Sequence, residues 1–215
     1  LGTPVLARSI LLFEQNPFIE KIVLVAKKEC AQEYEKIIFE QGFRKVAAII
    51  DGGKERQDSV FNGLKKLAEL GAAEEDIVLI HNSANPLVKQ EEINACIEAA
   101  KEFDAGVAAV PVKDTIKVVG EQAFIEHTPD RKNLFAAQTP QAIKFGLALR
   151  AFETALKQGF YGTDDVQLVE RIGGRVRIVP CSYENLKITT LEDVAIAEAI
   201  MRKRIEERGG KINEF

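Results

Sequence analysis

The sequence contains no tryptophan, one methionine and three cysteines among its 215 residues. The cysteines, Cys30, Cys96 and Cys181, are far apart, and none belongs to a Cys-x-x-Cys or Cys/His cluster. Their spacing and odd number argue against a disulfide framework and against zinc, and they favour a reduced, cytoplasmic setting. The two histidines, His81 and His127, also lack metal-ligand partners at a useful spacing, which favours structural roles for both.

Two further absences limit the class of protein. No uninterrupted apolar run approaches the ~20 residues that a membrane-spanning helix needs, so we expect no membrane association. The net charge of −4 provides no broad basic field, so we expect no nucleic-acid partner. A hydrophobic content of 46% with 29% charged residues is ordinary for a globular protein. The length suits a single domain over residues 1–215.

What the sequence does contain is an alternation of short apolar runs and amphipathic stretches. The apolar runs at residues 22–26, 46–50, 77–80, 106–112 and 176–179 predict buried strands. The amphipathic stretches predict helices at residues 4–14, 29–40, 90–103, 141–157, 164–171 and 191–207, and another after Ser59. This order predicts an α/β fold in three layers around a largely parallel, Rossmann-like sheet.

The alternation breaks in the middle of the chain. Residues 115–119 and 123–127 read as two short strands around Gly120-Glu121. A two-stranded hairpin is rarely stable alone and often packs on a partner. We therefore expect residues 112–133 to form an arm that projects from the domain.

A paired-glycine turn, Gly52-Gly53, joins the apolar run 46–50 to the helix after Ser59. Glycine lets backbone approach a ligand closely, and a helix N-terminus favours an anion. The same residues suit a plain strand-to-helix turn in which Asp58 or Ser59 caps the helix.

Ligands of open α/β sheets bind beyond the carboxyl ends of the strands. Three polar loops follow predicted strands there: residues 51–59, 81–86 and 111–115. Their convergence on one rim predicts a ligand site more strongly than any one loop does.

Six sequence blocks follow one another along the chain. They are Asp51-Gly52-Gly53 through Asp58-Ser59-Val60, Pro111-Val112-Lys113-Asp114-Thr115, Asp130-Arg131 before Leu134-Phe135, Gln138-Thr139-Pro140-Gln141, Thr163-Asp164-Asp165, and Asn185-Leu186-Lys187-Ile188-Thr189 with Glu192-Asp193. Taken in this order, they resemble the 2-C-methyl-D-erythritol 4-phosphate cytidylyltransferase family over essentially the whole chain. Ribitol-5-phosphate cytidylyltransferase is the close relative, and the Asp130-Arg131 block favours the methylerythritol enzyme.

The resemblance implies a nucleotidyltransferase fold and one reaction. A phosphate oxygen of methylerythritol phosphate attacks the α-phosphorus of CTP, and pyrophosphate leaves with Mg²⁺, in the non-mevalonate route to isoprenoids. A phosphate monoester is mostly dianionic at neutral pH, so this chemistry needs no strong general base. Positioning and charge neutralisation suffice, and cations and helix N-termini are the parts required.

The resemblance also implies residue roles. Lys187 and Arg131 are the catalytic candidates, beside the transferring phosphate and on the substrate phosphate respectively. The nucleotide-binding candidates are Gly52, Gly53, Ser59, Asn82 and Ser83, and the substrate-binding candidates are Thr115, Arg131, Thr139, Thr163, Asn85 and Lys187. Arg56 would mainly support the loop, and the arm would reach into a neighbouring subunit, which gives a homodimer with composite sites. No residue is assigned as a metal ligand.

Each of these positions also suits a purely structural role. Lys187 could be a surface lysine on a strand, and Arg131 could pair with Asp130 or Glu126 in a turn. The threonines suit helix starts: Thr139-Pro140 could open a helix, Thr163 or Asp164 could be an N-cap, and Thr189 could form a capping box with Glu192.

Two departures from the family pattern bear on activity. The family opens with a strand and a glycine-rich loop, L-A-A-G-x-G-x-R-M…P-K-Q, whereas this sequence starts at Leu1 in the segment that follows it. The family block H-D-[AS]-A-R-P reads His81-Asn82-Ser83-Ala84-Asn85-Pro86 here, so Asn82 replaces the Asp and Asn85 the Arg. These departures keep open a catalytically impaired nucleotide-binding homologue.

Overall fold

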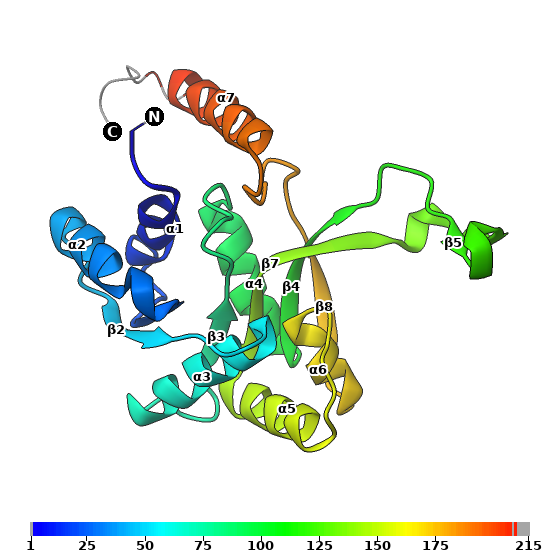
Figure 1. Cartoon of the computed structure of the whole chain (residues 1–215), viewed down its shortest axis with the longest axis horizontal. Coiled ribbons are helices and arrows are strands. Elements are labelled where there is room, and N and C mark those ends of the chain that lie inside the picture. Colours follow the sequence, from blue (N-terminus) through cyan, green and yellow to red (C-terminus); the bar gives the residue numbers. More distant parts are fainter. Residues whose placement is uncertain (1, 208, 210–215) are drawn as a thin grey trace.

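The computed structural model describes residues 2–207 and 209, and its chain alternates between helices and strands (Figure 1). The helices are α1 (Val5–Glu14), α2 (Ala31–Gln41), α3 (Arg56–Glu69), α4 (Gln90–Glu102), α5 (Phe145–Lys157), α6 (Asp165–Arg171) and α7 (Leu191–Glu207), with single 3-10 turns η1 (Lys28–Cys30), η2 (Glu121–Ala123) and η3 (Arg131–Asn133). The strands are β1 (Ile22–Ala26), β2 (Val46–Asp51), β3 (Ile77–Ile80), β4 (Ala105–Pro111), β5 (Val118–Val119), β6 (Ile125–His127), β7 (Phe135–Lys144) and β8 (Val176–Pro180). No helix in the described part of the chain is long and apolar enough to cross a membrane.

The central layer consists of two groups of strands. β1 and β2 form a parallel pair, and β3, β7, β4 and β8 form a four-stranded sheet in that order. Within the larger sheet β4 and β8 are parallel, whereas β7 runs antiparallel to both of its neighbours. The predicted α/β class with a mostly parallel sheet is confirmed, with β7 as the antiparallel exception.

The predicted helix over residues 141–157 is wrong in its first turn. Residues 135–144 form β7, and α5 starts only at Phe145. Ala142 and Ile143 are fully buried between β3 and β4, where both edges of β7 are paired. This non-local pairing satisfies the backbone on both sides, and it overrides the local helical pattern.

Three helix starts differ from the sequence predictions. Pro4, predicted as the first helical residue, instead occupies the N-cap of α1, and Glu55 occupies the N-cap of α3. Before α7 the carboxylate of Asp193, and not that of Glu192, accepts the N–H of Thr189 at 2.8 Å. The sequence therefore predicted where these helices begin to within a few residues, but not which side chain caps each one.

The core occupies both faces of the sheet. On one face α3, α5 and α6 cover β3 and β7, and the buried side chains include Leu64, Ile143, Phe152 and Val169. On the other face α4 packs closely on β4, where a Cβ added to Gly106 would lie 2.7 Å from the Cβ of Ala99. The four-stranded sheet is therefore covered by helices on both of its faces.

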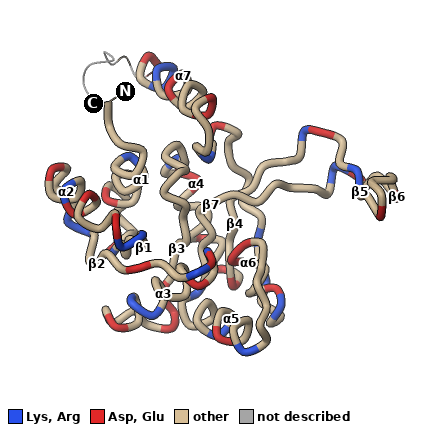
Figure 2. Tube along the Cα trace, in the orientation of Figure 1, with Lys and Arg blue, Asp and Glu red and all other residues tan. Residues whose placement is uncertain are grey.

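The segment between β4 and β7 projects away from this layered body as an arm (Figure 1). β5 and β6 pair antiparallel near its tip, as the sequence predicted. At its base the N–H of Val112 donates to the carbonyl of Leu134 at 3.1 Å. Charges of both signs alternate over the arm and the helices (Figure 2).

We expect Phe152→Ala to lower the free energy of unfolding by about 3–5 kcal/mol, because its ring is 1% exposed and stacks on Phe61. Urea denaturation followed by circular dichroism measures this loss. Phe39→Ala is the matched control, since the Phe39 side chain is 87% exposed, and its change should stay under about 0.5 kcal/mol. Equal losses in the two variants would contradict the position of the core.

Candidate functional site

The Gly52-Gly53 turn at the end of β2 is held by hydrogen bonds within the protein. The N–H of Gly52 donates to the carbonyl of Ala26 at 2.8 Å, and the N–H of Gly53 donates to Ser59 Oγ at 2.9 Å. A Cβ on Gly53 would overlap the Cβ of Asp58, so glycine is required here by the approach of α3 itself. Gly52, Gly53 and Ser59 therefore lie together in one hydrogen-bonded turn.

This turn places the N-terminus of α3 at the rim. The Asp58 carboxylate accepts the N–H of Glu55 at 3.0 Å, which fixes the first turn of the helix. α3 is 14 residues long, and the positive end of its dipole favours an anion within the first turn.

A bidentate ion pair fastens the start of α3 to α6. Arg56 donates from Nη1 and Nη2 to the two carboxylate oxygens of Asp165 at 2.9 and 2.6 Å. The Asp165 side chain is 1% exposed; burial raises its pKa, while the Arg56 hydrogen bonds and charge oppose that rise. Removing Arg56 would leave the buried Asp165 carboxylate without compensation, so the pair determines where the turn sits.

The side-chain amide of Gln141 on β7 completes this connection. Gln141 is 2% exposed, and its Oε1 accepts the N–H groups of Asp165 and Val166, both at 3.0 Å. Its Nε2 donates to the Asp164 carboxylate at 3.1 Å. The end of β7, the start of α6 and the start of α3 are therefore parts of one hydrogen-bonded network.

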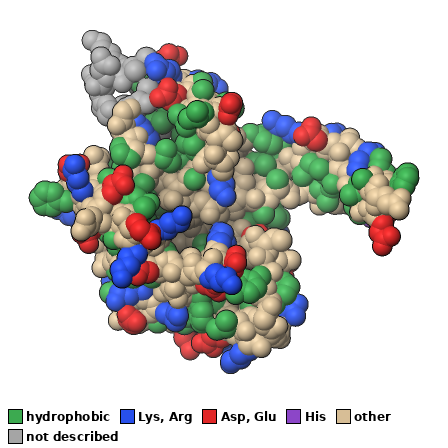
Figure 3. All heavy atoms as spheres, in the orientation of Figure 1, with side chains coloured by type: hydrophobic (Ala, Val, Ile, Leu, Met, Phe, Trp, Pro, Cys, Tyr) green, Lys and Arg blue, Asp and Glu red, His purple; other side chains and the backbone are tan. Residues whose placement is uncertain are grey.

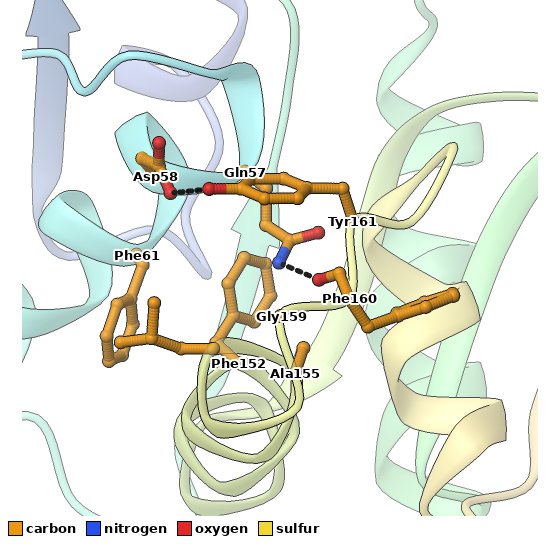
Figure 4. Close-up of a pocket in the computed structure, with 9 residues that line it drawn as sticks. Gln57, Asp58, Phe61, Phe152, Ala155, Gly159, Phe160 and Tyr161 are labelled. Atoms are coloured by element: carbon orange, nitrogen blue, oxygen red, sulfur yellow. Dashed lines mark hydrogen bonds between the residues drawn. The ribbon is translucent and has the colours of Figure 1, made fainter.

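The loop before α6 is tied to α3 by a second set of contacts. Gln57 donates from Nε2 to the carbonyl of Phe160 at 2.9 Å, and the Tyr161 hydroxyl lies 3.4 Å from Asp58 Oδ1 (Figure 4). The cavity that these residues line holds about 30 Å³, which is room for water but not for a nucleotide. These contacts leave Thr163 exposed at the loop surface, next to the N-cap Asp164 of α6.

The loop that follows β3 meets three other segments. The N–H of Asn82 donates to Thr139 Oγ1 at 3.2 Å, and the Ser9 hydroxyl donates to the carbonyl of Ser83 at 2.6 Å. The N–H of Ile188 donates to the carbonyl of Ala84 at 2.8 Å. The structure thus brings Asn82, Ser83 and Thr139 together with the chain that carries Lys187.

Asn85 is buried beneath this loop, against Asn185. Its side chain is 3% exposed, and its amide donates to the carbonyl of Asn185 at 3.4 Å. Asn185, which is 1% exposed, donates in turn to the carbonyl of Thr139 at 2.8 Å. The Oδ1 atoms of both asparagines are buried and lack a partner within the described residues. Substrate contact by Asn85 stays a prediction, and the burial favours a supporting role.

Lys187 is exposed in the loop between β8 and α7, and not on a strand. Its ammonium has no hydrogen-bond or ion-pair partner among residues 2–207. An unpaired lysine beside two polar loops is available to neutralise a phosphate, since no carboxylate competes for it.

Arg131 and Thr115 lie apart from this group, on the arm. Arg131 is exposed in η3 and donates to the carbonyl of Lys113 at 2.6 Å, while Thr115 is exposed near the base. The arm leads away from the turn at Gly52 in the same chain (Figure 1). Within one chain, therefore, the structure does not bring Arg131 to the other predicted residues.

A cleft of about 680 Å³ opens beside the rim loops. Ser59, Asn82 and Ser83 line one end of it, so three of the nucleotide-binding candidates share one space. In the space-filling view several Lys and Arg side chains border the hollowed centre of this face (Figure 3).

Comparison with known proteins decides the family. Residues 1–203 match the sequence profile of the 2-C-methyl-D-erythritol 4-phosphate cytidylyltransferases. The chain belongs to this family. The enzyme of that name from Clostridioides difficile is 48% identical over 205 residues, which cover 94% of this chain and 84% of the relative. That from Geobacter metallireducens is 43% identical over 205 residues, or 95% and 88% of the two chains.

Solved structures agree with this cytidylyltransferase assignment. The 4-diphosphocytidyl-2C-methyl-D-erythritol synthase from Anaerococcus prevotii superposes with a TM-score of 0.84 at 29% identity, over 94% of this chain and 87% of that one. The 2-C-methyl-D-erythritol 4-phosphate cytidylyltransferase from Francisella tularensis gives 0.79 at 28% identity, over 92% and 88%. These likenesses confirm the nucleotidyltransferase type of fold.

The described residues of this cytidylyltransferase contain no group of three or more His, Cys, Asp or Glu side chains that could hold a metal ion. Asn82 stands at the position of the family Asp, and an amide brings no negative charge to a cation. The described residues therefore offer no carboxylate cluster that would hold Mg²⁺.

Several residues that shape the site had no role in the sequence predictions. They are Gln141, Asp165, Asn185 and Gln57. All four stand inside the sequence blocks quoted above, which was the available signal. Their polar partners are remote in sequence, so the blocks could not show which hydrogen bonds they make.

His81 provides a test of this rim by pH. Its Nε2 lies 2.9 Å from the carbonyl of Asn85, and its ring contacts Phe13 edge-on. Its Nδ1 is buried and has no hydrogen-bond partner among the residues that the structure describes. Burial lowers the pKa of His81 to about 4, against an ordinary value near 6.5. The folded protein therefore keeps His81 neutral at pH values where the unfolded chain binds a proton there.

We expect the free energy of unfolding to fall by about 2 kcal/mol between pH 7 and pH 5 on account of His81. Over this range the unfolded chain binds a proton at His81, whereas the folded protein does not. His81→Gln should remove that part of the pH dependence in urea denaturation at both pH values. His127→Gln is the matched control, since His127 is exposed on the arm. The same pH slope in wild type and in the His81 variant would refute the buried neutral ring.

Proposed function

We propose that this protein transfers CMP from CTP to 2-C-methyl-D-erythritol 4-phosphate and releases pyrophosphate, in isoprenoid precursor biosynthesis. The family match over residues 1–203 carries the proposal. The rim supports it, because Ser59, Asn82 and Ser83 line one cleft and the unpaired Lys187 stands on the adjoining loop. The comparisons give no support to the impaired homologue or to the ribitol-phosphate enzyme.

The reaction breaks one phosphorus–oxygen bond and forms another. A phosphate oxygen of the sugar phosphate attacks the α-phosphorus, and the bond to the departing pyrophosphate breaks, with no proton transfer required at the dianionic nucleophile. The N-terminus of α3 and the Gly52-Gly53 turn would hold the nucleotide, and Lys187 would neutralise the oxygens that gain charge. Mg²⁺ would reach the site as part of the CTP complex.

A homodimer would complete the site. The arm exposes a group of apolar side chains that remain 39–71% exposed among the described residues: Ile116, Val119, Phe124, Ile125 and Phe135. Contiguous exposed apolar surface of this kind marks an interface, and a second copy of the arm could cover it. Such a dimer would carry Arg131 and Thr115 to the partner's rim, where the Arg131 guanidinium could bind a phosphate.

The direct test is pyrophosphate release from CTP and methylerythritol phosphate, with ribitol 5-phosphate as the competing acceptor. We expect turnover with a preference for methylerythritol phosphate in kcat/KM. CTP binding without pyrophosphate release would favour the impaired homologue, to which the asparagines at positions 82 and 85 point. A preference for ribitol phosphate would overturn the proposed substrate.

A mixing experiment tests the composite site. We expect Lys187→Ala and Arg131→Ala each to lower kcat by about 10²–10³, because each removes a cation from the reacting phosphates. In an equal mixture of the two variants, re-formed dimers should recover about a quarter of wild-type activity, since half are mixed and each mixed dimer has one intact site.

The control for mixing is Lys132→Ala, because Lys132 is exposed next to Arg131 and pairs with Asp130. This variant should keep nearly full activity alone and in mixtures. Mixed dimers that form but recover no activity would place Arg131 and Lys187 of one site in the same chain.

A further inference from the structure

The side-chain amide of Asn82 has no partner within the protein. The side chain is half-buried in the loop after β3, lines the cleft of about 680 Å³ and makes no hydrogen bond to any described residue. The backbone around it is fixed, because the N–H of Asn82 donates to Thr139 Oγ1 at 3.2 Å and its carbonyl accepts the N–H of Asn85 at 2.9 Å. Water in the cleft therefore reaches an amide that no other group holds.

The next residue supplies a second free group. Ser83 is exposed, and its N–H has no acceptor among residues 2–207 and 209. It stands at the second position of the turn that the hydrogen bond between Asn82 and Asn85 closes, outside every described helix and strand. Joining the Ser83 nitrogen to Cγ of Asn82 closes a five-membered ring, and the small serine side chain leaves this approach open.

The fold blocks the same ring closure at the other asparagines that it describes. Asn16 and Asn85 each precede a proline, whose nitrogen carries no hydrogen. Asn62 and Asn94 lie inside α3 and α4, where the N–H of the following residue belongs to the helical hydrogen-bond ladder. Attack at these two positions therefore requires a helix to open first.

Asn133 and Asn185 are each followed by a leucine whose N–H is occupied. The N–H after Asn133 donates to the carbonyl of Arg131 at 3.0 Å. The N–H after Asn185 donates to the carbonyl of Glu184 at 2.8 Å. Of the asparagines that the structure describes, Asn82 alone therefore combines a free amide, a free following N–H and access to water.

We propose that Asn82 is a site of spontaneous deamidation, which converts its side-chain amide into a carboxylate on the rim of the cleft. The Asp product is the residue that the pattern H-D-[AS]-A-R-P carries at this position. This inference is independent of the proposed function, because the reaction requires only the folded chain and water.

The chemistry balances with water as the only co-reactant. The backbone nitrogen of Ser83 gives up its proton and bonds to Cγ of Asn82, the bond from Cγ to Nδ2 breaks, and ammonia leaves with that proton. Water then opens the cyclic imide. Cleavage of the new bond between nitrogen and Cγ gives Asp, and cleavage of the original peptide bond gives isoaspartate, in which the main chain runs through Cγ. Either product adds one negative charge to the protein.

Peptide mass spectrometry tests the proposal on the intact chain. The folded protein is kept in warm, mildly alkaline buffer and digested with trypsin at intervals, and a zero-time digest gives the background. Asn82 falls in the tryptic peptide 67–89, where fragmentation separates it from Asn85. We expect Asn82 to gain one dalton at least about tenfold faster than Asn62, because attack at Asn62 requires α3 to open.

A sample in guanidinium chloride is the control, since it removes the fold and leaves the sequence. There the order should reverse, because the glycine after Asn62 has no side chain to hinder attack. Modification of Asn82 in the denatured sample alone would overturn the proposal. So would Asn62 reacting as fast as Asn82 in the folded protein.

Two substitutions of Ser83 test the route. Ser83→Val keeps the N–H but places a β-branched side chain beside it, and it should slow the modification of Asn82 at least about tenfold. Ser83→Ala is the matched control: it keeps a small side chain, so the wild-type rate should remain. Circular dichroism checks that both variants fold, and Ser83→Thr replaces Ser83→Val if that variant does not. Equal rates in the branched and the alanine variants would overturn ring closure by this nitrogen.

Discussion

The buried amide of Gln141 is the interaction on which the rim depends. It accepts two N–H groups at the start of α6 and thereby holds Asp165 where Arg56 can bind both of its carboxylate oxygens. Arg56 is the first residue of α3, so the same network determines where the helix N-terminus and the Gly52-Gly53 turn stand. Since a buried amide left unpaired is costly, the network holds as a whole or is lost as a whole.

The strands that could be predicted from the sequence are those whose signal is local. Residues 22–26 and 77–80 are unbroken apolar runs, and both are strands with these bounds. β7 had no such signal, because its stability comes from β3 and β4 on either side and not from its own residues. The caps of α3 and α7 differed because neighbouring acidic side chains can accept the same N–H groups.

The sequence predicted which residues belong to the candidate site better than it predicted how they are arranged in space. The family resemblance gave Ser59, Asn82, Ser83 and Thr139, which the structure gathers at one rim. It could not show that Asn85 is enclosed against Asn185, because that packing depends on a loop one hundred residues later. Nor could it show how far Arg131 lies from the rim of its own chain, which follows from the length and direction of the arm.

The base of the arm is in direct contact with the loop that carries Lys187. The Tyr183 hydroxyl donates to the carbonyl of Pro111 at 2.6 Å, and the Lys113 ammonium lies 3.6 Å from the centre of the Tyr183 ring. Tyr183 is four residues before Lys187 on the same loop. A movement of the arm about its base is therefore transmitted through Tyr183 to the loop that carries Lys187.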